Sequence, residues 1–406
     1  MLLLSSHYSE ASMFISTSPS RLKVMFAGLC SLILTMGVAR FSYTPLLPVM
    51  MNETFLTNAT GGWLATINYM GYMSGALMAA FISDLKLKDT LYRIGLFIAI
   101  LSTIGMALAE NYILWAIMRF FAGLSSAAGL LLGSGLILNW MIRQGHRAEL
   151  GIHFGGVGLG IALSAAISMS MSESYNWAQQ WQAFSIIGIL LALPAWYWLP
   201  KPASSNITQT GQQLIDKAPR KSWMLLLYAA YFCAGVGYVI SATFLVTIVD
   251  KQADLQASLQ GNGNLVWLLV GLAATPACVF WDRVARKMGE LKALFVAYAI
   301  NIVGIIIPAI DSSLAGIMLG GLLFGATFIG IVSLMLTMVG KFFPTKPAKP
   351  MGKLTLSYGV AQIAAPAMAG AVAEATGSYV MPLFMASGVM AIGMLLLVIL
   401  FFHERN

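Results

Sequence analysis

Two arginines interrupt the long apolar runs of this sequence. Arg40 is the only charged residue between Val24 and Asn52, and Arg119 is the only one in the run 112–140. A guanidinium is a rigid planar fork of hydrogen-bond donors that matches the geometry of carboxylate and phosphate groups. These residue types in these positions predict that the protein binds an anion.

The acidic residues do not accompany the arginines. None lies deep inside an apolar run, and six lie at the outer ends of runs, namely Glu53, Glu110, Glu173, Asp250, Asp311 and Glu374. An arginine near the middle of a membrane span costs at least about 2.5–3.5 kcal/mol. Because the chain provides no deep carboxylate to offset that cost, a bound anion would account for Arg40.

Each arginine also has an alternative role that does not involve an anion. Arg40 could hydrogen-bond main-chain carbonyls that Pro45 and Pro48 release from the helical ladder. Arg119 could be structural or serve proton movement. At a helical rise of about 1.5 Å per residue, Arg40 lies roughly 15 Å and Arg119 roughly 12 Å from the outer end of its run. Both could therefore face the same water-filled space.

Membrane-spanning helices are the elements that would position these residues. The 406 residues are 59% hydrophobic and only 9% charged, whereas soluble proteins carry about 25% charged residues. Apolar runs of the length that crosses a bilayer, about 20 residues, fall into two sets of six. The first set is 24–50, 61–83, 91–109, 112–140, 149–171 and 177–199. The second set is 223–249, 261–281, 291–310, 313–340, 352–376 and 379–402.

The sequence thus predicts an all-α integral membrane protein with twelve transmembrane helices in two six-helix bundles, residues 21–199 and 223–406. Residues 1–20 lack the basic start and long apolar core of a signal peptide, and we expect them to form a disordered cytoplasmic tail. Residues 200–222 are rich in Ser, Gln, Pro and Lys and are expected to form a flexible cytoplasmic linker. The three cysteines have neither disulfide nor metal-ligand spacing.

The basic residues predict the orientation in the membrane. With both termini in the cytoplasm, 20 of the 23 Lys and Arg residues lie on the cytoplasmic side, and Lys251 alone lies outside. This imbalance is what the positive-inside rule requires of a multi-pass protein. The net charge of +8 is therefore attributed to orientation, and no nucleic-acid partner is expected.

The two halves of the chain also match each other at an offset of about 200 residues, as parallel six-span repeats of a transporter would. RFFAGLSSAAGLLLG matches GGLLFGATFIGIVSL with a shift of one residue, which places Gly123 opposite Gly325. FGGVGLG aligns with YGVAQIA, which places Gly155 opposite Gly359.

Residues 21–402 resemble a major facilitator superfamily transporter. GVARFSYTPLLPVM (37–50) is similar to the first span of the YbfB/YjiJ-like group of bacterial permeases, and FGATFIGIVSL and YGVAQIAAPAMAG are similar to its tenth and eleventh spans. The general motifs of the superfamily are less complete. Asp84 remains from the loop motif after span two, and FWDRVARKMG preserves the matching loop in the second half. Span four has Ala122 where glutamine is usual, and span five has Gly156 where the exporter motif has proline.

This resemblance implies a transporter of the bacterial inner membrane, in which two bundles rock around one site near the bilayer midplane. We expect a monomer surrounded by lipid that uses ion gradients and no cofactor. Arg40 and Arg119 would lie on spans that line the cavity. Aromatic and amide groups would form the rest of its wall, although each alone is typical of helix packing: Tyr43, Asn68, Tyr72, Tyr231, Tyr238, Trp267, Tyr358 and Gln362.

Two residues are candidates for proton coupling. His153 is the only histidine within a span and has an ordinary pKa near neutrality, but its place among glycines favours helix packing. Glu374 is the other candidate. At the predicted cytoplasmic gate, Asp84 and Asp282 are expected to act as salt-bridge latches with the basic residues Arg283 and Arg286, with solvated loop charges as the alternative.

The predicted function is secondary active transport of a small, carboxylate-like anion, by proton symport or exchange. Export of amphipathic drugs or metabolites is the alternative. An intramembrane enzyme would need His, Asp or Ser clustered at helical spacing, and no such cluster appears, so we predict a protein without enzymatic activity. A receptor would need an output domain, whereas the longest predicted loop is the linker.

Overall fold

The computed structural model describes residues 20–171, 174–203, 208, 211, 213–251, 264–376, 378 and 380–403. Within its helices, the side chains of residues 58–59, 243–251, 366–367, 370–371 and 373–374 are outside the description. The predicted tail, apart from Ser20, and part of the predicted linker also lie outside the described residues.

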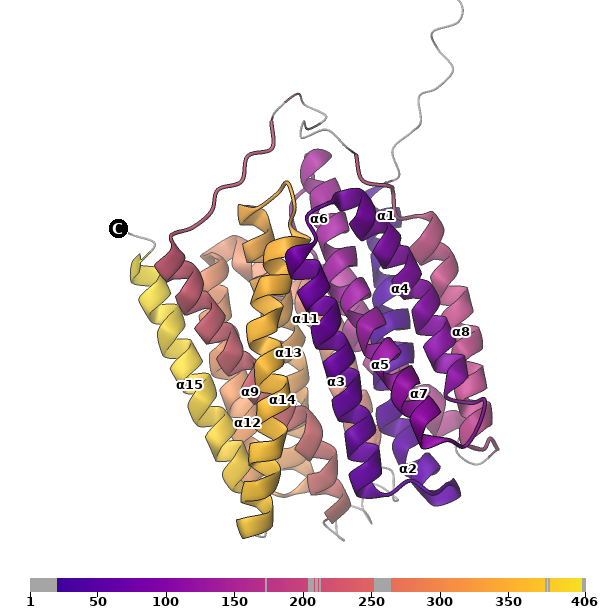
Figure 1. Ribbon diagram of the computed structural model, residues 1–406. Coiled ribbons are helices and arrows are strands. Elements are labelled where there is room, and N and C mark those ends of the chain that lie inside the picture. Colours follow the sequence, from indigo (N-terminus) through magenta and orange to yellow (C-terminus); the bar gives the residue numbers. More distant parts are fainter. Residues whose placement is uncertain are drawn as a thin grey trace, which may run out of the picture.

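The first half of the described chain forms six continuous helical segments (Figure 1). The first segment consists of α1 (Arg21–Leu32), a π-helical stretch η1 (Ile33–Phe41) and α2 (Tyr43–Glu53). The next two are α3 (Asn58–Phe81) and α4 (Leu85–Gly105). The fourth consists of α5 (Tyr112–Ala127), the π-helical η2 (Ala128–Gly133) and α6 (Ser134–Arg143), and it is followed by α7 (Gly151–Met171) and α8 (Trp177–Tyr197).

The second half repeats this plan with six helices. They are α9 (Lys221–Lys251), α11 (Asn264–Met288), α12 (Glu290–Ile310), α13 (Leu314–Phe342), α14 (Ala348–Thr376) and α15 (Val380–His403). Of the described segments, eight are long and apolar enough on length and composition alone to cross a membrane. The prediction of an all-α protein with twelve transmembrane helices in two bundles is confirmed.

Local chemistry sets the helix ends. Asn111, Asn176 and Ser313 begin their helices by accepting a hydrogen bond from a backbone N–H three residues ahead, which satisfies a donor that the helix leaves free. Asp84 does the same for α4 through Lys86 N, so α4 starts six residues before the predicted run 91–109. Gly289 alone separates α11 from α12 at a φ of 89°, a conformation that glycine adopts without steric penalty.

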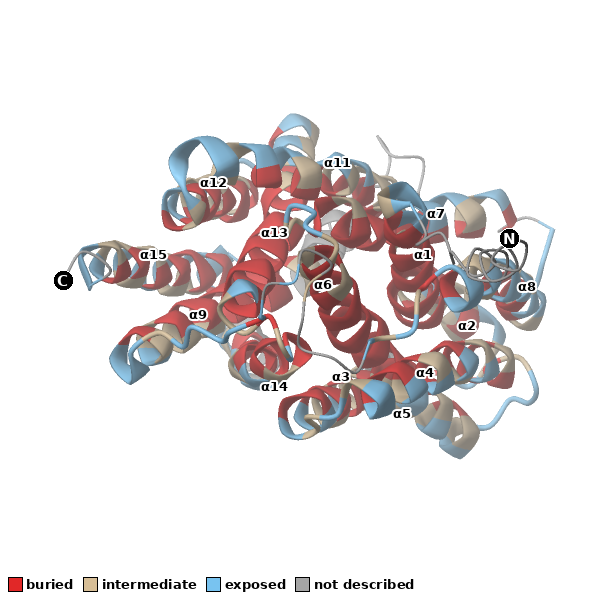
Figure 2. Ribbon diagram, turned by 90° about the horizontal axis from the view of Figure 1, so that it is seen from above, coloured by how far each residue is buried: buried red, intermediate tan, exposed pale blue. Residues whose placement is uncertain are grey.

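Buried faces of the helices point toward the centre of the molecule and apolar exposed faces point outward (Figure 2). The two bundles meet where α7 lies beside α11 and α3 lies beside α14. Small residues allow this close approach, because a Cβ atom at Gly158 would meet the backbone of Thr275 and Ala274, and one at Gly352 would meet the backbone of α3.

The predicted internal repeat has a structural counterpart. Gly123 in the fourth segment lies against the backbone of α3, the second segment, and Gly325 in the tenth lies against α11, the eighth. Likewise Gly155 of α7 lies against Thr275 of the opposite bundle, and Gly359 of α14 lies against Met73 of the opposite bundle. Equivalent glycines therefore occupy equivalent helix crossings in the two halves.

Candidate functional site

A pocket with about 360 Å³ of empty space lies between the two bundles, and we call it the central pocket. About 30 Å³ of this space admits a molecule the size of water, so the pocket is narrow in this arrangement of the two bundles. Its residues from the first half are Met36, Arg40, Phe41, Tyr72, Leu130 and Val157. Those from the second half are Tyr231, Tyr238, Phe328, Ile329, Val332, Tyr358 and Gln362.

Arg40 is the only charged residue of the central pocket among the residues that the structure describes. It lies in the π-helical stretch η1, and only 5% of it is exposed. Its guanidinium carbon is 4.7 Å from the ring centre of Tyr72, 4.8 Å from that of Tyr69 and 5.5 Å from that of Phe41. The positive charge is therefore surrounded by aromatic faces, which attract a cation without neutralising it.

No described carboxylate forms an ion pair with Arg40; the ion pairs of the described chain lie elsewhere. No described main-chain oxygen accepts a hydrogen bond from its guanidinium either, so the alternative that involves carbonyls near Pro45 and Pro48 has no counterpart in the structure. A buried cation without such partners is unfavourable. An anion in the central pocket would offset that penalty.

Arg119 occupies a different position from Arg40. Its guanidinium donates hydrogen bonds to the main-chain oxygen of Ala39 at 3.2 Å and to that of Arg40 at 3.4 and 3.5 Å. It also lies 4.3 Å from the ring centre of Tyr43. Arg119 does not line the central pocket. Its hydrogen bonds hold the backbone segment that carries Arg40. Such bonds from a guanidinium to main-chain carbonyls are the structural role that we considered for Arg40 itself.

Two further predicted site residues belong to this supporting layer. The hydroxyl of Tyr43 donates to the Gly61 carbonyl at 2.8 Å, and the amide of Asn68 donates to the Arg119 carbonyl at 2.8 Å. Both are buried and neither lines the central pocket. They fix the first and fourth segments against α3.

The second half provides an aromatic wall opposite Arg40. The ring centres of Tyr231 and Tyr358 are 4.7 Å apart, and those of Tyr238 and Tyr358 are 5.7 Å apart. Tyr238 also stacks on Phe328 at 5.4 Å. Trp267 lies behind Phe41, with 6.2 Å between their ring centres, and does not itself line the central pocket.

Gln362 follows Tyr358 by one helical turn and faces the same pocket. It is 4% exposed, and its side-chain oxygen Oε1 has no hydrogen-bond partner among the described residues. Buried polar atoms in folded proteins nearly always have a partner. This atom is therefore free to accept a hydrogen bond from a ligand.

Of the two proton-coupling candidates, His153 has a described side chain, and it does not line the central pocket. His153 is fully buried, and its Nε2 is 2.8 Å from the hydroxyl of Ser134. Its ring also fills the space beside Gly28, where a Cβ atom would overlap it. These contacts are those of a packing residue that joins α7 to α1 and α6. The side chain of Glu374 lies outside the described residues.

The end of the molecule where α8 ends and α9 begins is at the top of Figure 1, and we call it the linker end. The predicted gate residues belong to the start of α4 and the last turns of α11, which lie at this end. Asp282 accepts a hydrogen bond from Gly151 N at 2.7 Å, and Arg286 pairs with Glu149 at 3.0 Å. Both contacts join the two bundles. Arg283 is exposed, and Asp84 caps α4 within the first bundle.

Other contacts at the linker end involve residues that we did not predict. Asn139 donates to the Pro344 carbonyl at 2.7 Å, and Lys349 donates to the Ser83 hydroxyl at 3.0 Å. Neither motif nor spacing distinguishes these residues in the sequence, because each contact depends on which helix faces come together.

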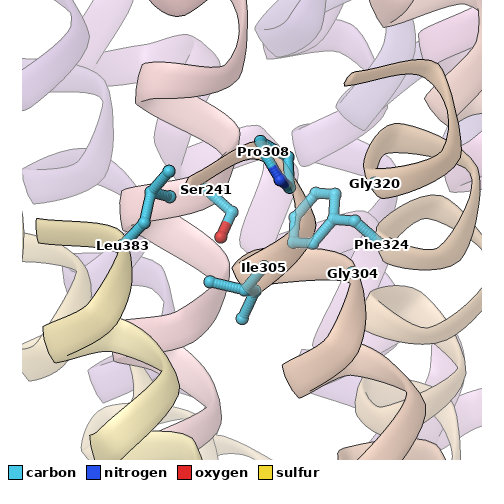
Figure 3. Close-up of a pocket in the computed structure, with 7 residues that line it drawn as sticks. All are labelled: Ser241, Gly304, Ile305, Pro308, Gly320, Phe324 and Leu383. Atoms are coloured by element: carbon cyan, nitrogen blue, oxygen red, sulfur yellow. The ribbon is translucent and has the colours of Figure 1, made fainter. Parts of the chain in front are cut away.

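A second pocket, with about 240 Å³ of empty space, lies within the second bundle among α9, α12, α13 and α15. Figure 3 shows the Ser241 hydroxyl directed toward Ile305, with Phe324 and Leu383 to either side. Its lining contains no charged residue among the described ones. It is thus a gap between packed helices and a weaker candidate than the central pocket.

Comparisons with known proteins agree with this architecture. A family model described as "Uncharacterised MFS-type transporter YbfB" matches residues 32–398. The uncharacterized MFS-type transporter YceJ of Bacillus subtilis (strain 168) is 25% identical over 286 residues, which cover 65% of this chain and 67% of YceJ. The MFS transporter cpaT of Aspergillus oryzae is 28% identical over 259 residues, which cover 56% of this chain and 51%, or about half, of cpaT.

Among solved structures, that of the human organic anion transporter MFSD10 (TETRAN) superposes with a TM-score of 0.71. The match covers 93% of this chain and 100% of that chain at 16% sequence identity. At this identity the likeness concerns the fold.

Proposed function

Because this chain belongs to the YbfB-type family of major facilitator superfamily transporters, we propose that it carries a small organic monoanion across the membrane by alternating access. The family and the relatives are transporters, and we assign the chain no enzymatic activity. The single observation that carries the substrate class is the buried guanidinium of Arg40, which meets no described carboxylate.

The charge of the central pocket supports a monoanion. With Arg40 as the one cation of the described lining, a carboxylate gains a bidentate, charge-assisted partner, whereas a second negative charge finds none. An organic cation would be repelled at close range. The apolar side chains of Met36, Leu130 and Val332 in the same lining favour a ligand with an apolar body.

The bound anion would also link the two bundles. Arg40 comes from the first bundle, whereas Tyr231, Tyr238 and Tyr358 come from the second. A ligand that contacts both sides stabilises the arrangement in which they are close, and alternating access requires such a coupling of binding to bundle motion. The Asp282 and Arg286 contacts at the linker end would break when the pocket opens on that side.

The positive-inside distribution of Lys and Arg residues identifies the linker end with the cytoplasm in this proposal. We propose a monomer in a bacterial inner membrane with both termini cytoplasmic. Uptake would be driven by proton symport or exchange. Glu374 remains the candidate proton carrier, since the contacts of His153 favour a structural role.

Export of amphipathic anions is the second candidate function. The aromatic and aliphatic lining of the central pocket favours it. MFSD10, which shares this fold, is named as an organic anion transporter, and that name is consistent with an anionic cargo here. Transport assays in right-side-out and inverted vesicles distinguish export from uptake by the side from which the anion is taken.

A thermal-shift screen of the purified protein tests the substrate class. The panel contains organic monocarboxylates, dicarboxylates, phosphates, sulfonates, organic cations and neutral drugs. A ligand at about 100 times its Kd stabilises the folded state by about 2.7 kcal/mol, so we expect monocarboxylates to raise the unfolding midpoint. They should not do so in Arg40→Ala, while Arg283→Ala, an exposed control, behaves like wild type. Stabilisation by cations or neutral drugs alone would exclude the anion proposal.

A further inference from the structure

Gln362 gives the central pocket a second polar feature on the opposite bundle from Arg40. It is only 4% exposed, it lines the pocket, and its Oε1 has no described hydrogen-bond partner. An amide oxygen that loses water on burial without gaining a donor destabilises the folded state. This atom therefore points to a ligand that brings a hydrogen-bond donor.

The fold separates this acceptor from the cationic group. Arg40 lies in η1 of the first bundle, and Gln362 lies in α14 of the second, on the same helix face as Tyr358. A ligand that satisfies both carries a carboxylate toward the first bundle and a hydrogen-bond donor toward the second. The two contacts then join the two bundles through the ligand.

Aromatic rings from the second bundle form a large part of the same lining. Tyr231, Tyr238 and Tyr358 form a connected cluster with ring centres 4.7 and 5.7 Å apart, and Phe328 extends it. Flat rings stack on such surfaces or meet them edge to face. The part of the ligand between its carboxylate and its donor therefore matches an aromatic ring better than a flexible polar chain.

We propose that the substrate is a hydroxylated aromatic monocarboxylate, whose carboxylate pairs with Arg40 and whose hydroxyl donates to Gln362. This inference rests on the proposed function and narrows it. It also gives Gln362 a specificity-determining role, because an analogue without the hydroxyl leaves the amide oxygen buried and unpaired. A neutral hydrogen bond of this kind corresponds to about a tenfold difference in affinity.

The test measures binding of three matched pairs to the purified full-length protein by calorimetry: 4-hydroxybenzoate and benzoate, 4-hydroxyphenylacetate and phenylacetate, and 3-(4-hydroxyphenyl)propionate and 3-phenylpropionate. We expect at least one hydroxylated acid to bind about tenfold more tightly than its partner. Gln362→Met, which keeps the length of the side chain but not its polar atoms, should bind both members equally. Gln144→Met at the linker end of α6 is the control and should keep the preference.

The outcomes separate this inference from the proposed function. Equal binding within all three pairs in the wild type, or a preference that survives in Gln362→Met, overturns the role of Gln362 and leaves an Arg40-dependent anion transporter. The failure of all six acids to bind, when other monoanions bind in an Arg40-dependent way, overturns the aromatic class alone. The absence of any Arg40-dependent anion binding overturns both. The comparison of each hydroxylated acid with its unhydroxylated partner in the wild type needs no variant. Equal binding there overturns the role of Gln362 even if Gln362→Met does not fold.

Discussion

Arg40 and Arg119 are both buried arginines of the first bundle, yet their surroundings assign them opposite roles. The guanidinium of Arg119 is hydrogen-bonded within the protein, because it donates to the main-chain carbonyls of Ala39 and Arg40. That of Arg40 meets aromatic faces and the open pocket. Removal of Arg119, which is hydrogen-bonded to the backbone, and removal of Arg40, which has no described carboxylate partner, should therefore change the stability of the folded protein differently.

Thermal unfolding without ligand distinguishes the two roles. Arg119→Leu should lower the unfolding midpoint, because charge-assisted hydrogen bonds of about 1.5–3 kcal/mol are lost and the carbonyls stay unpaired. Arg40→Met should leave the midpoint unchanged or raise it, because it removes a buried cation that has aromatic neighbours but no described carboxylate partner. The exposed Arg283→Met is the reference. An Arg40→Met protein that is the less stable of the two would show that Arg40 is structural.

At the residue scale, the sequence indicated which side chains are unusual but not which atoms they meet. Hydropathy gives the depth of a residue along a helix, whereas its direction around the axis depends on packing. Arg40, Tyr72, Tyr231, Tyr238, Tyr358 and Gln362 converge on the central pocket, while Tyr43, Asn68, Arg119 and Trp267 lie behind it. A depth estimate cannot separate these two groups.

At the scale of elements, contacts at the linker end join the start of α7 to α11, and we propose that they hold this end closed. The N–H of Gly151 at the start of α7 donates to the Asp282 carboxylate, where the positive end of the helix dipole favours a negative charge. The Arg286–Glu149 pair extends the same interface. Cys278, which is buried on α11 one turn from Asp282, offers a native reporter of its opening.

Charge reversal tests this latch. In a protein that retains Cys278 as its only cysteine, Glu149→Arg or Arg286→Glu should place like charges together and increase maleimide labelling of Cys278. Exposed ion pairs contribute up to about 1 kcal/mol, so the increase is expected to be about two- to fivefold. The double variant should restore the wild-type rate, and Arg283→Glu should not change it. Fast labelling that persists in the double variant would contradict a pairwise latch.

The π-helical stretches η1 and η2 were not predicted. The sequence suggested that Pro45 and Pro48 would disturb the first span, but the irregular part precedes them and ends with the Ser42 N–H bonded to the Gly37 carbonyl at 2.9 Å. A π-helical turn leaves carbonyls out of the regular ladder and is common at functional sites. Two carbonyls of η1, those of Ala39 and Arg40, accept hydrogen bonds from the Arg119 side chain of another helix, and the sequence of the first span alone does not reveal that contact.

At the scale of the whole molecule, the fold was predictable because a chain that crosses lipid must satisfy its backbone hydrogen bonds internally, which few structures allow. Apolar runs of sufficient length, the alternation of basic loops and the repeat of glycines fixed twelve helices in two bundles, and the resemblance carried by residues 37–50 is confirmed by the family model over residues 32–398. The helix ends shifted where caps such as Asp84 extend a helix beyond its apolar run. The cargo and the contacts between the bundles, by contrast, depend on how the two bundles face each other.

Counterflow in proteoliposomes tests the central claim most directly. Vesicles that contain the protein and are loaded with an unlabelled monocarboxylate identified by its binding are diluted into the same compound in labelled form. The account predicts rapid accumulation of label with the wild type and with Arg283→Ala, and none above empty vesicles with Arg40→Ala. Wild-type counterflow by Arg40→Ala, or counterflow that only cationic or neutral compounds support, would contradict it.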